Sequence, residues 1–200
     1  MHGFQFNPGE SASLLRLTRR LVESAIRRRS SRVQISSQLS EIPVSGLFVT
    51  LRNGGRLRAC MGAWHGLPPG LLGSSLPSAA RSAAIGDHRC PPILESELSD
   101  LRIELSLLHN PRSIDSASGA ARITAIEVGR HGLLVADAAQ TGLLLPQVAV
   151  DHGWNARTFL DHTALKAGLR KNAWRSPKVR LTTFEAVKLA EDPDPEPPAR

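Results

Sequence analysis

A cysteine follows a glycine-rich turn in the stretch LRACMG, and an arginine stands two residues before it. A cysteine thiolate is a strong nucleophile, and positive charge beside the thiol lowers its pKa and so raises the thiolate fraction. Arg58 could supply that charge to Cys60, because residues two apart on a strand point to the same face. The alternative is a cysteine that acts as a small buried hydrophobic residue. Cys60 is therefore a candidate nucleophile, with Arg58 as its activator or as an anchor for an anion.

The turn Asn53-Gly54-Gly55 predicts a β-hairpin that would carry this cysteine on its second strand. The hydrophobic alternation on both strands favours a three-residue loop, since a two-residue loop would pair apolar with polar residues. In that register Thr50 lies opposite Arg58, and Phe48 lies opposite Cys60. The core-facing side of the second strand would then carry Leu57, Ala59 and Met61.

A second group of candidates follows an expected helix end at Gly86. Asp87, His88 and Arg89 precede two prolines, which fix the backbone of a loop and suit it for presenting side chains. The alternative is an Asp–Arg ion pair that only closes the loop. No histidine stands at a fixed spacing from Cys60, so a general base would have to reach it through the fold, with His88 and His131 as the candidates.

Two further candidates for binding a ligand lie later in the chain. Gln147 follows a proline in an apolar run, so its amide needs a hydrogen-bond partner, either a ligand or nearby backbone groups. Lys166 either reaches into a cleft with a shifted pKa or extends along its helix with the charge in water. Metal binding is disfavoured, because the chain lacks a Cys-x-x-Cys and a His-x-x-x-His motif. Phosphate binding is also disfavoured, because no Lys-Ser/Thr follows the glycine-rich stretch GLPPGLLGSS. We interpret that stretch as a surface loop. The sequence implies no cofactor.

The composition and the distribution of charge disfavour two classes of protein, nucleic-acid-binding proteins and membrane proteins. The formal net charge is +7, but residues 1–32 hold most of the excess, and no aromatic residues interleave with the basic ones, which disfavours nucleic-acid binding. No apolar run approaches the ~20 residues that span a bilayer. With two cysteines and no signal peptide, we expect a soluble, cytoplasmic protein that does not associate with membranes.

Helical and alternating hydrophobic patterns are mixed along the chain, with several turn signals between the strands, which predicts an α+β fold. The acidic, proline-rich end, 191–200, is expected to be disordered. The expected helices are 8–29, 76–85 and 156–167, and the expected strands are the hairpin, 101–108, 179–187 and three short ones within 125–149.

The order and spacing of LRACMG, AARSAAIGDHRCPP, ELSDLRIELSLL, GRHGLLV, GLLLPQVAVDHGW and FLDHTALKAGL resemble the AMMECR domain family. This family is named after the chromosomal region of Alport syndrome with midface hypoplasia and elliptocytosis. The resemblance implies one domain, 1–190, of two closely packed subdomains, the larger built on an antiparallel sheet. It also implies a context, because related proteins resemble protein A of the AmmeMemoRadiSam system, with a Memo-like and a radical SAM protein as partners.

The resemblance supplies no settled reaction, so two functions stay open. The first is thiol-assisted group transfer or hydrolysis, with Cys60 as nucleophile. The second is a non-catalytic module that binds a protein or peptide. The chain also departs from the family pattern: Ala59 and Met61 replace Gly and Ile, Cys90 ends a stretch usually written Asp-Pro-Arg-Phe, and Ala164 stands where a second family cysteine is usual.

Overall fold

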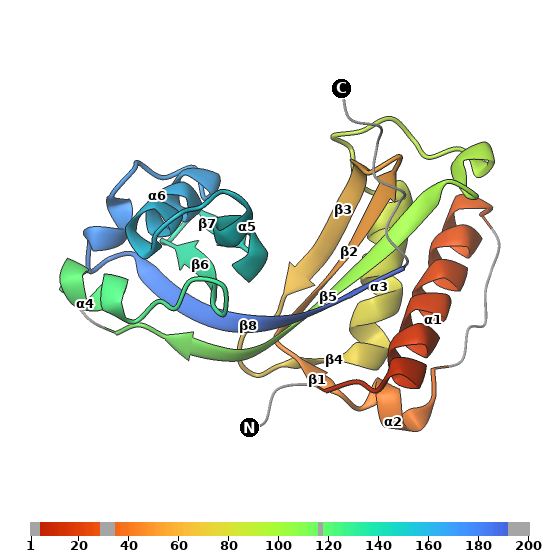
Figure 1. Ribbon diagram of the computed structural model, residues 1–200, viewed down its shortest axis with the longest axis horizontal. Helices are drawn as coiled ribbons and strands as arrows, with labels where there is room; N and C mark the ends of the chain where they lie inside the picture. The colour runs from red at the N-terminus through yellow and green to blue at the C-terminus, as the bar shows by residue number, and fades with distance from the viewer. Residues whose placement is uncertain (1–4, 29–34, 116–117, 192–200) are drawn as a thin grey trace. The chain divides into compact units, whose positions relative to one another are not determined.

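The computed structural model describes residues 5–28, 35–115 and 118–191 and shows the expected α+β fold (Figure 1). Six strands form one sheet in the order β3-β2-β5-β8-β6-β7, and β1 pairs with β4 in a two-stranded sheet. The chain divides into two compact units. The N-terminal unit holds the described residues within 4–107 and 187–200, and the C-terminal unit holds those within 108–186. Apart from residue 191, the expected disordered tail lies outside the described residues.

In the N-terminal unit, helix α3 packs on strands β2 and β3, and helix α1 packs against α3 (Figure 1). The core between them is aliphatic, and Leu14, Leu47, Leu72 and Leu105 are fully buried in it. The elements are α1 (Pro8–Ile26), α2 (Ser37–Ser40), β1 (Pro43–Val44), β2 (Gly46–Asn53), β3 (Arg56–Trp64), β4 (Gly70–Leu71), α3 (Leu72–Ile85), the 3-10 helix η1 (Glu95–Glu97) and β5 (Leu101–Ser113), which continues into the other unit.

The start of α1 is confirmed. The Asn7 side chain accepts a hydrogen bond from the N–H of Glu10, and the Glu10 carboxylate accepts one from the N–H of Asn7, each over 2.9 Å. This capping box satisfies backbone donors that have no partner inside the helix.

Helix α3 begins four residues before the predicted start, so the second half of GLPPGLLGSS is not a loop. Leu72 and Leu76 are both fully buried, and they lie one turn apart on the same face of the helix. Burial of these two side chains stabilises the first turn by several kcal/mol, on the order of 1.5–3 for each leucine, which offsets the cost of Pro77 inside the helix.

The predicted hairpin register is wrong. Asn53 pairs with Arg56 across a two-residue turn, in which Gly54 and Gly55 have φ of +54° and +74°. Two successive positive φ angles match the mirror-image turns that suit the twist of hairpins. Hydrophobic alternation predicts the register only where the pairing continues without a break, and here it is interrupted between Leu51 and Arg52.

A β-bulge at Arg58 restores the hydrophobic pairing that a two-residue loop alone would lose. Beyond the bulge, Thr50 lies opposite Cys60 and Leu51 lies opposite Ala59, so the pairing is two residues away from the predicted one. A two-residue shift keeps every side chain on its predicted face. Leu57 lies before the bulge and is 57% exposed, so its predicted place in the core is also wrong.

In the C-terminal unit, helix α6 packs on strands β6 and β7. Phe159 and Trp174 are fully buried in its core. The elements are α4 (Gly119–Thr124), β6 (Gly132–Ala136), β7 (Thr141–Leu144), α5 (Pro146–Asp151), α6 (Ala156–Lys166), the 3-10 helix η2 (Ala173–Arg175) and β8 (Arg180–Ala190), whose last residues belong to the other unit.

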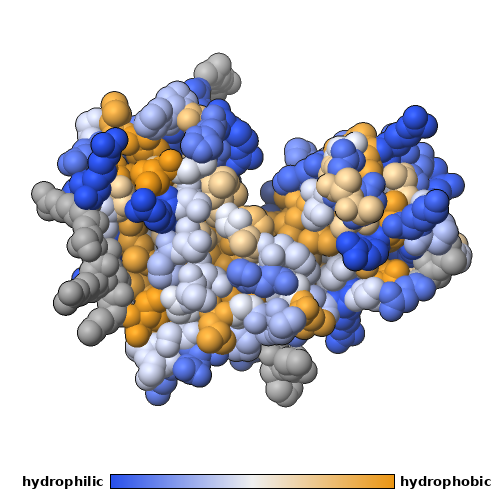
Figure 2. All heavy atoms as spheres, turned by 180° about the vertical axis from the view of Figure 1, so that it is seen from behind, coloured by the Kyte–Doolittle hydropathy of each residue, from blue (hydrophilic) through white to orange (hydrophobic). Residues whose placement is uncertain are grey.

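The prediction of three short strands within 125–149 is wrong at both ends. Residues 125–131 form turns, since the N–H groups of Arg130 and His131 both donate to the carbonyl of Glu127. After β7 the chain turns into helix α5, because Pro146 occupies the first helical position, where no backbone donor is needed. On the face shown in Figure 2, hydrophobic and hydrophilic residues both reach the surface of each unit.

Candidate functional site

Five of the candidate residues lie together at strand β3, which is an edge strand of the six-stranded sheet. The Asp87 carboxylate accepts a hydrogen bond from the N–H of Cys60 over 3.0 Å. The Arg89 guanidinium donates to the carbonyl of Cys60 over 2.9 Å. These two contacts use the main-chain groups of Cys60 that point away from β2. The loop after α3 is thereby fixed to the edge of the sheet.

Asp87 and Arg89 also form a bidentate ion pair with each other. Nε and Nη2 of Arg89 each lie 2.8 Å from a carboxylate oxygen of Asp87. The Asp87 side chain is 4% exposed, whereas that of Arg89 is 68% exposed. The hydrogen bonds from Arg89 hold the pKa of the Asp87 carboxyl well below its usual range, with help from the N–H of Cys60. Asp87 is therefore a buried anion that stabilises the loop.

Arg58 binds the far end of the same loop. Its guanidinium makes two hydrogen bonds with Glu97, of 2.7 and 3.0 Å, and one each with the carbonyls of Pro91 and Pro92. The hydrogen bonds from Arg58 lower the pKa of Glu97 to about 2, and those to Glu97 raise the pKa of Arg58. The Arg58 charge is therefore shared with a carboxylate, and four of its N–H donors are in use.

Cys60 itself is half-buried. The Thr50 hydroxyl, directly opposite on β2, lies 3.3 Å from the Cys60 sulfur and can donate a hydrogen bond to it.

A cavity of about 270 Å³ opens beside this loop. Its walls combine aliphatic groups from β3, α3 and the loop with four polar side chains. The polar lining residues are Arg58, Asp87, His88 and Cys90, and the apolar ones are Ala59, Ala83, Ala84, Ile85, Pro91, Pro92 and Ile93. Arg58, Asp87 and His88 were predicted as site residues from the sequence, whereas Cys90 was noted only because it replaces the family phenylalanine.

The other three candidates lie in the C-terminal unit. His131 closes the turn before β6, where its Nδ1 accepts a hydrogen bond from the N–H of Glu127 over 3.0 Å. Burial and the charge of Arg130 lower the pKa of His131, so its imidazole is neutral at pH 7. Gln147 is half-buried in α5, and Lys166 is exposed at the end of α6.

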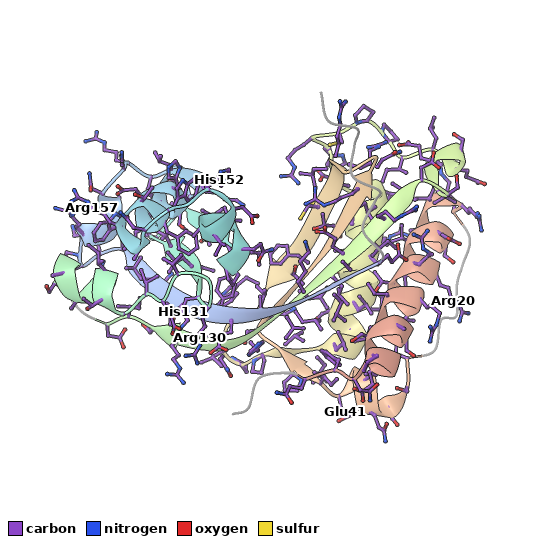
Figure 3. The ribbon with its side chains drawn as sticks, in the orientation of Figure 1. Arg20, Glu41, Arg130, His131, His152 and Arg157 are labelled. Atoms are coloured by element: carbon purple, nitrogen blue, oxygen red, sulfur yellow. The ribbon has the colours of Figure 1, made fainter. Side chains whose placement is uncertain are left out.

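A polar cluster beside His131 was missed by the sequence analysis. The Glu185 carboxylate on β8 accepts hydrogen bonds from Arg130, over 3.2 Å, and from Asn110, over 3.5 Å. Burial alone would raise the pKa of Glu185, but these two donors outweigh it and the pKa is lowered. Figure 3 shows Arg130 and His131 side by side near β8. The signal available in the sequence was the GRHG turn, but no pattern linked it to β8.

An aromatic stack lies elsewhere in the same unit. The Trp154 ring stacks with two imidazoles, with centroid distances of 4.7 Å to His152 and 3.9 Å to His162.

Within the described residues, no three His, Cys, Asp or Glu side chains are grouped so that they could hold a metal ion. No helix among them has the length and apolar character needed to cross a membrane.

The chain is similar to a known protein family, to individual proteins and to a solved structure. The AMMECR1 family model matches residues 15–189. Protein MK0488 of Methanopyrus kandleri is 41% identical over 158 residues, which covers 78% of this chain and 75% of the relative. A protein of Methanothermobacter thermautotrophicus is 37% identical over 185 residues, 92% of this chain and 95% of the relative. The crystal structure of the uncharacterized protein PH0010 from Pyrococcus horikoshii matches with a TM-score of 0.83 and 31% identity, over 94% of this chain and 95% of that one.

Proposed function

The chain belongs to the AMMECR1 family, and from this premise we propose that it is a binding module that holds an apolar side chain of a partner polypeptide in the cavity beside β3. The observation that carries the proposal is the pairing of the charges around this cavity. Arg58 is paired with Glu97, and Asp87 is paired with Arg89. These side chains hold the loop in place, and the loop in turn supplies the wall of the cavity.

The size and lining of the cavity suit an aliphatic side chain. A volume of about 270 Å³ is just below the range of about 300–1,000 Å³ that is usual for small-molecule sites. Burying one leucine or isoleucine there would stabilise a complex by roughly 1.5–3 kcal/mol. The polar groups at its edge, such as the exposed imidazole of His88, can orient the peptide backbone of the partner.

The loop and the end of α3 also expose apolar surface. Ile85 lines the cavity and is 49% exposed, and Leu94 shortly after the loop is 62% exposed. Exposed apolar groups beside a concave surface are typical of protein-binding sites. A partner that covers Ile85 would gain contacts at the rim in addition to those inside.

The test is selection of peptides from a random display library against the full chain, followed by titration of the selected peptides. We expect peptides with an aliphatic anchor whose affinity falls at least about tenfold in Ile85→Asp, because a charge at the rim must be desolvated on binding. Leu165→Asp is the matched control, since Leu165 is 48% exposed near the end of α6, in the other unit. Selected peptides that bind the two variants equally, or no selected peptides, would contradict the proposal.

A second candidate is thiol-assisted group transfer or hydrolysis on a small substrate or a modified side chain, with a Memo-like and a radical SAM protein as partners. The observation that favours it is that the cavity holds a thiol, Cys90, and an imidazole, His88. In this candidate the catalytic roles fall to Cys60, Arg58, His88 and His131, and the ligand contacts to Asp87, Arg89, Gln147 and Lys166.

Alkylation by iodoacetamide across pH tests this candidate. The variants Cys60→Ser and Cys90→Ser each leave one thiol, so that each rate belongs to one residue. A catalytic thiol is expected to react with a midpoint well below the ~8.5 of a free cysteine. A midpoint near that value, or no reaction, for both thiols would remove the physical basis of the enzyme.

A further inference from the structure

The two cysteines of the chain are held by the same residue. The N–H of Cys60 donates to the carboxylate of Asp87 over 3.0 Å, and the N–H of Cys90 donates to the main-chain carbonyl of Asp87 over 3.2 Å. One cysteine lies on strand β3 and the other in the loop after α3. Asp87 thus connects two segments that are distant in sequence, and the backbone N–H of each cysteine is hydrogen-bonded to it.

A cation lies at this junction as well. The Arg89 guanidinium donates to the carbonyl of Cys60 over 2.9 Å, and Arg89 directly precedes Cys90 in the chain. The hydrogen bond to Asp87 is the first cause of the raised pKa of Arg89, and the charges of Cys60 and Cys90 add to it. The thiolate is the form of a cysteine that attacks disulfides, and Arg89 places a cation at the junction of the two segments.

The two thiols differ in their surroundings. Cys90 lines the cavity of about 270 Å³, together with His88, so a small reagent can approach its sulfur. The sulfur of Cys60 lies 3.3 Å from the Thr50 hydroxyl, on the strand opposite. Cys90 is thus the thiol that a reagent in the cavity meets, whereas Cys60 is not among the residues that line the cavity.

We propose that Cys90 and Cys60 are an attacking and a resolving thiol, which react with low-molecular-weight disulfides and end as an intramolecular disulfide. This goes beyond the binding function and does not depend on it. In the first step the Cys90 thiolate attacks one sulfur of the reagent, a mixed disulfide forms, and the other half leaves as a thiolate that takes up a proton. In the second step the Cys60 thiolate attacks the Cys90 sulfur, and the second half of the reagent leaves. Two protein thiols are oxidised and one reagent disulfide is reduced to two thiols.

The second step requires that Cys90 and Cys60 reach disulfide geometry, with Cα atoms about 4.4–6.8 Å apart. Cys60 is fixed by the strand and by the contacts with Asp87 and Arg89, whereas residues 91–94 after Cys90 form neither helix nor strand. Any movement toward that geometry falls to the loop, and it would change the wall of the cavity that Cys90 lines.

The experiment treats the full wild-type chain with glutathione disulfide, quenches it with acid, and maps peptides without reduction. We expect a monomer in which the peptide with Cys60 is linked to the peptide with Cys90, and the link is released by dithiothreitol. Cys60→Ser is expected to stop at a glutathione adduct on Cys90. Cys90→Ser is expected to react at least about tenfold more slowly, because the thiol that lines the cavity is gone.

Four outcomes would overturn the proposal: independent glutathione adducts on both cysteines of the wild-type chain, a link between two copies, adduct formation at Cys60 in Cys90→Ser as fast as in the wild type, or no reaction. The wild-type map alone decides between an internal link and the alternatives, so the result does not depend on the folding of a variant. A failure here leaves peptide binding at the cavity intact, and loss of peptide binding in Ile85→Asp leaves the thiol chemistry intact.

Discussion

Gly62→Ala is expected to destabilise the N-terminal unit by about 3 kcal/mol or more, because the added methyl has no space. A Cβ at this position would lie 2.0 Å from the Leu47 carbonyl oxygen and 2.6 Å from the Phe48 Cα. Both are backbone atoms of β2, so no side-chain rotation relieves the clash. The two strands must separate at the pair formed by Phe48 and Gly62, two residues beyond Cys60.

Thermal unfolding followed by circular dichroism measures this effect. For a chain of this size, 3 kcal/mol corresponds to a fall in Tm of about 6–12 °C. Gly119→Ala is the control, since a Cβ there meets only side-chain atoms of Trp174 and Arg175 at 3.6 Å, and alanine favours the helix. We expect the control to change stability by less than about 1 kcal/mol. An unchanged Tm in Gly62→Ala would show that the strands pair differently from the structure.

The hairpin shows which structural features the local hydrophobic pattern predicts and which it does not. Alternation of apolar and polar residues assigned Cys60 to the correct face, because in a sheet with one buried face only one of the two alternating sets of residues can face the core. It could not assign the partner across the hairpin, because a bulge at Arg58 changes the register while leaving the residues beyond it on their predicted faces. The cost of a bulge depends on the twist and contacts of both strands, which are not encoded in the spacing of hydrophobic residues.

The candidate site likewise contains contacts that were predicted from the sequence and contacts that were not. Asp87 and Arg89 were predicted either to close the loop or to present side chains, and the structure has them as an ion pair that also binds the backbone of Cys60. The proximity of Glu97 to Arg58 was outside the reach of sequence reasoning, since the two are separated by helix α3 and the loop. The same holds for Glu185 and Arg130. Pairing between distant segments is decided by tertiary packing, and no local spacing reports it.

Acid sensitivity of the Arg58–Glu97 pair is the second large effect expected. The pKa of Glu97 is lowered from 4.5 to about 2, so the folded state binds this proton more weakly than the unfolded state does. Its contribution to stability is therefore fully present above about pH 5 and is lost as the pH falls toward 2. A depression of this size corresponds to about 3 kcal/mol, and the 22% exposure of the Glu97 side chain reduces it to about 2–3 kcal/mol.

The measurement is the free energy of unfolding in urea at pH 6 and at pH 3, for the wild type and Glu97→Gln. We expect the variant to be about 2 kcal/mol less stable at pH 6 and about 1 kcal/mol less stable at pH 3, because protonation of the unfolded wild type removes only part of the contribution by pH 3 and the rest is lost as the pH falls toward 2. Asp87 also has a lowered pKa and contributes equally to both proteins, so it cancels in the difference. Glu95→Gln is the control, since Glu95 is 64% exposed and its ion pair with Arg27 spans 3.9 Å. A constant difference between Glu97→Gln and the wild type across this range would mean that Arg58 is not held by Glu97, and that its charge is free for the cysteine on the same strand.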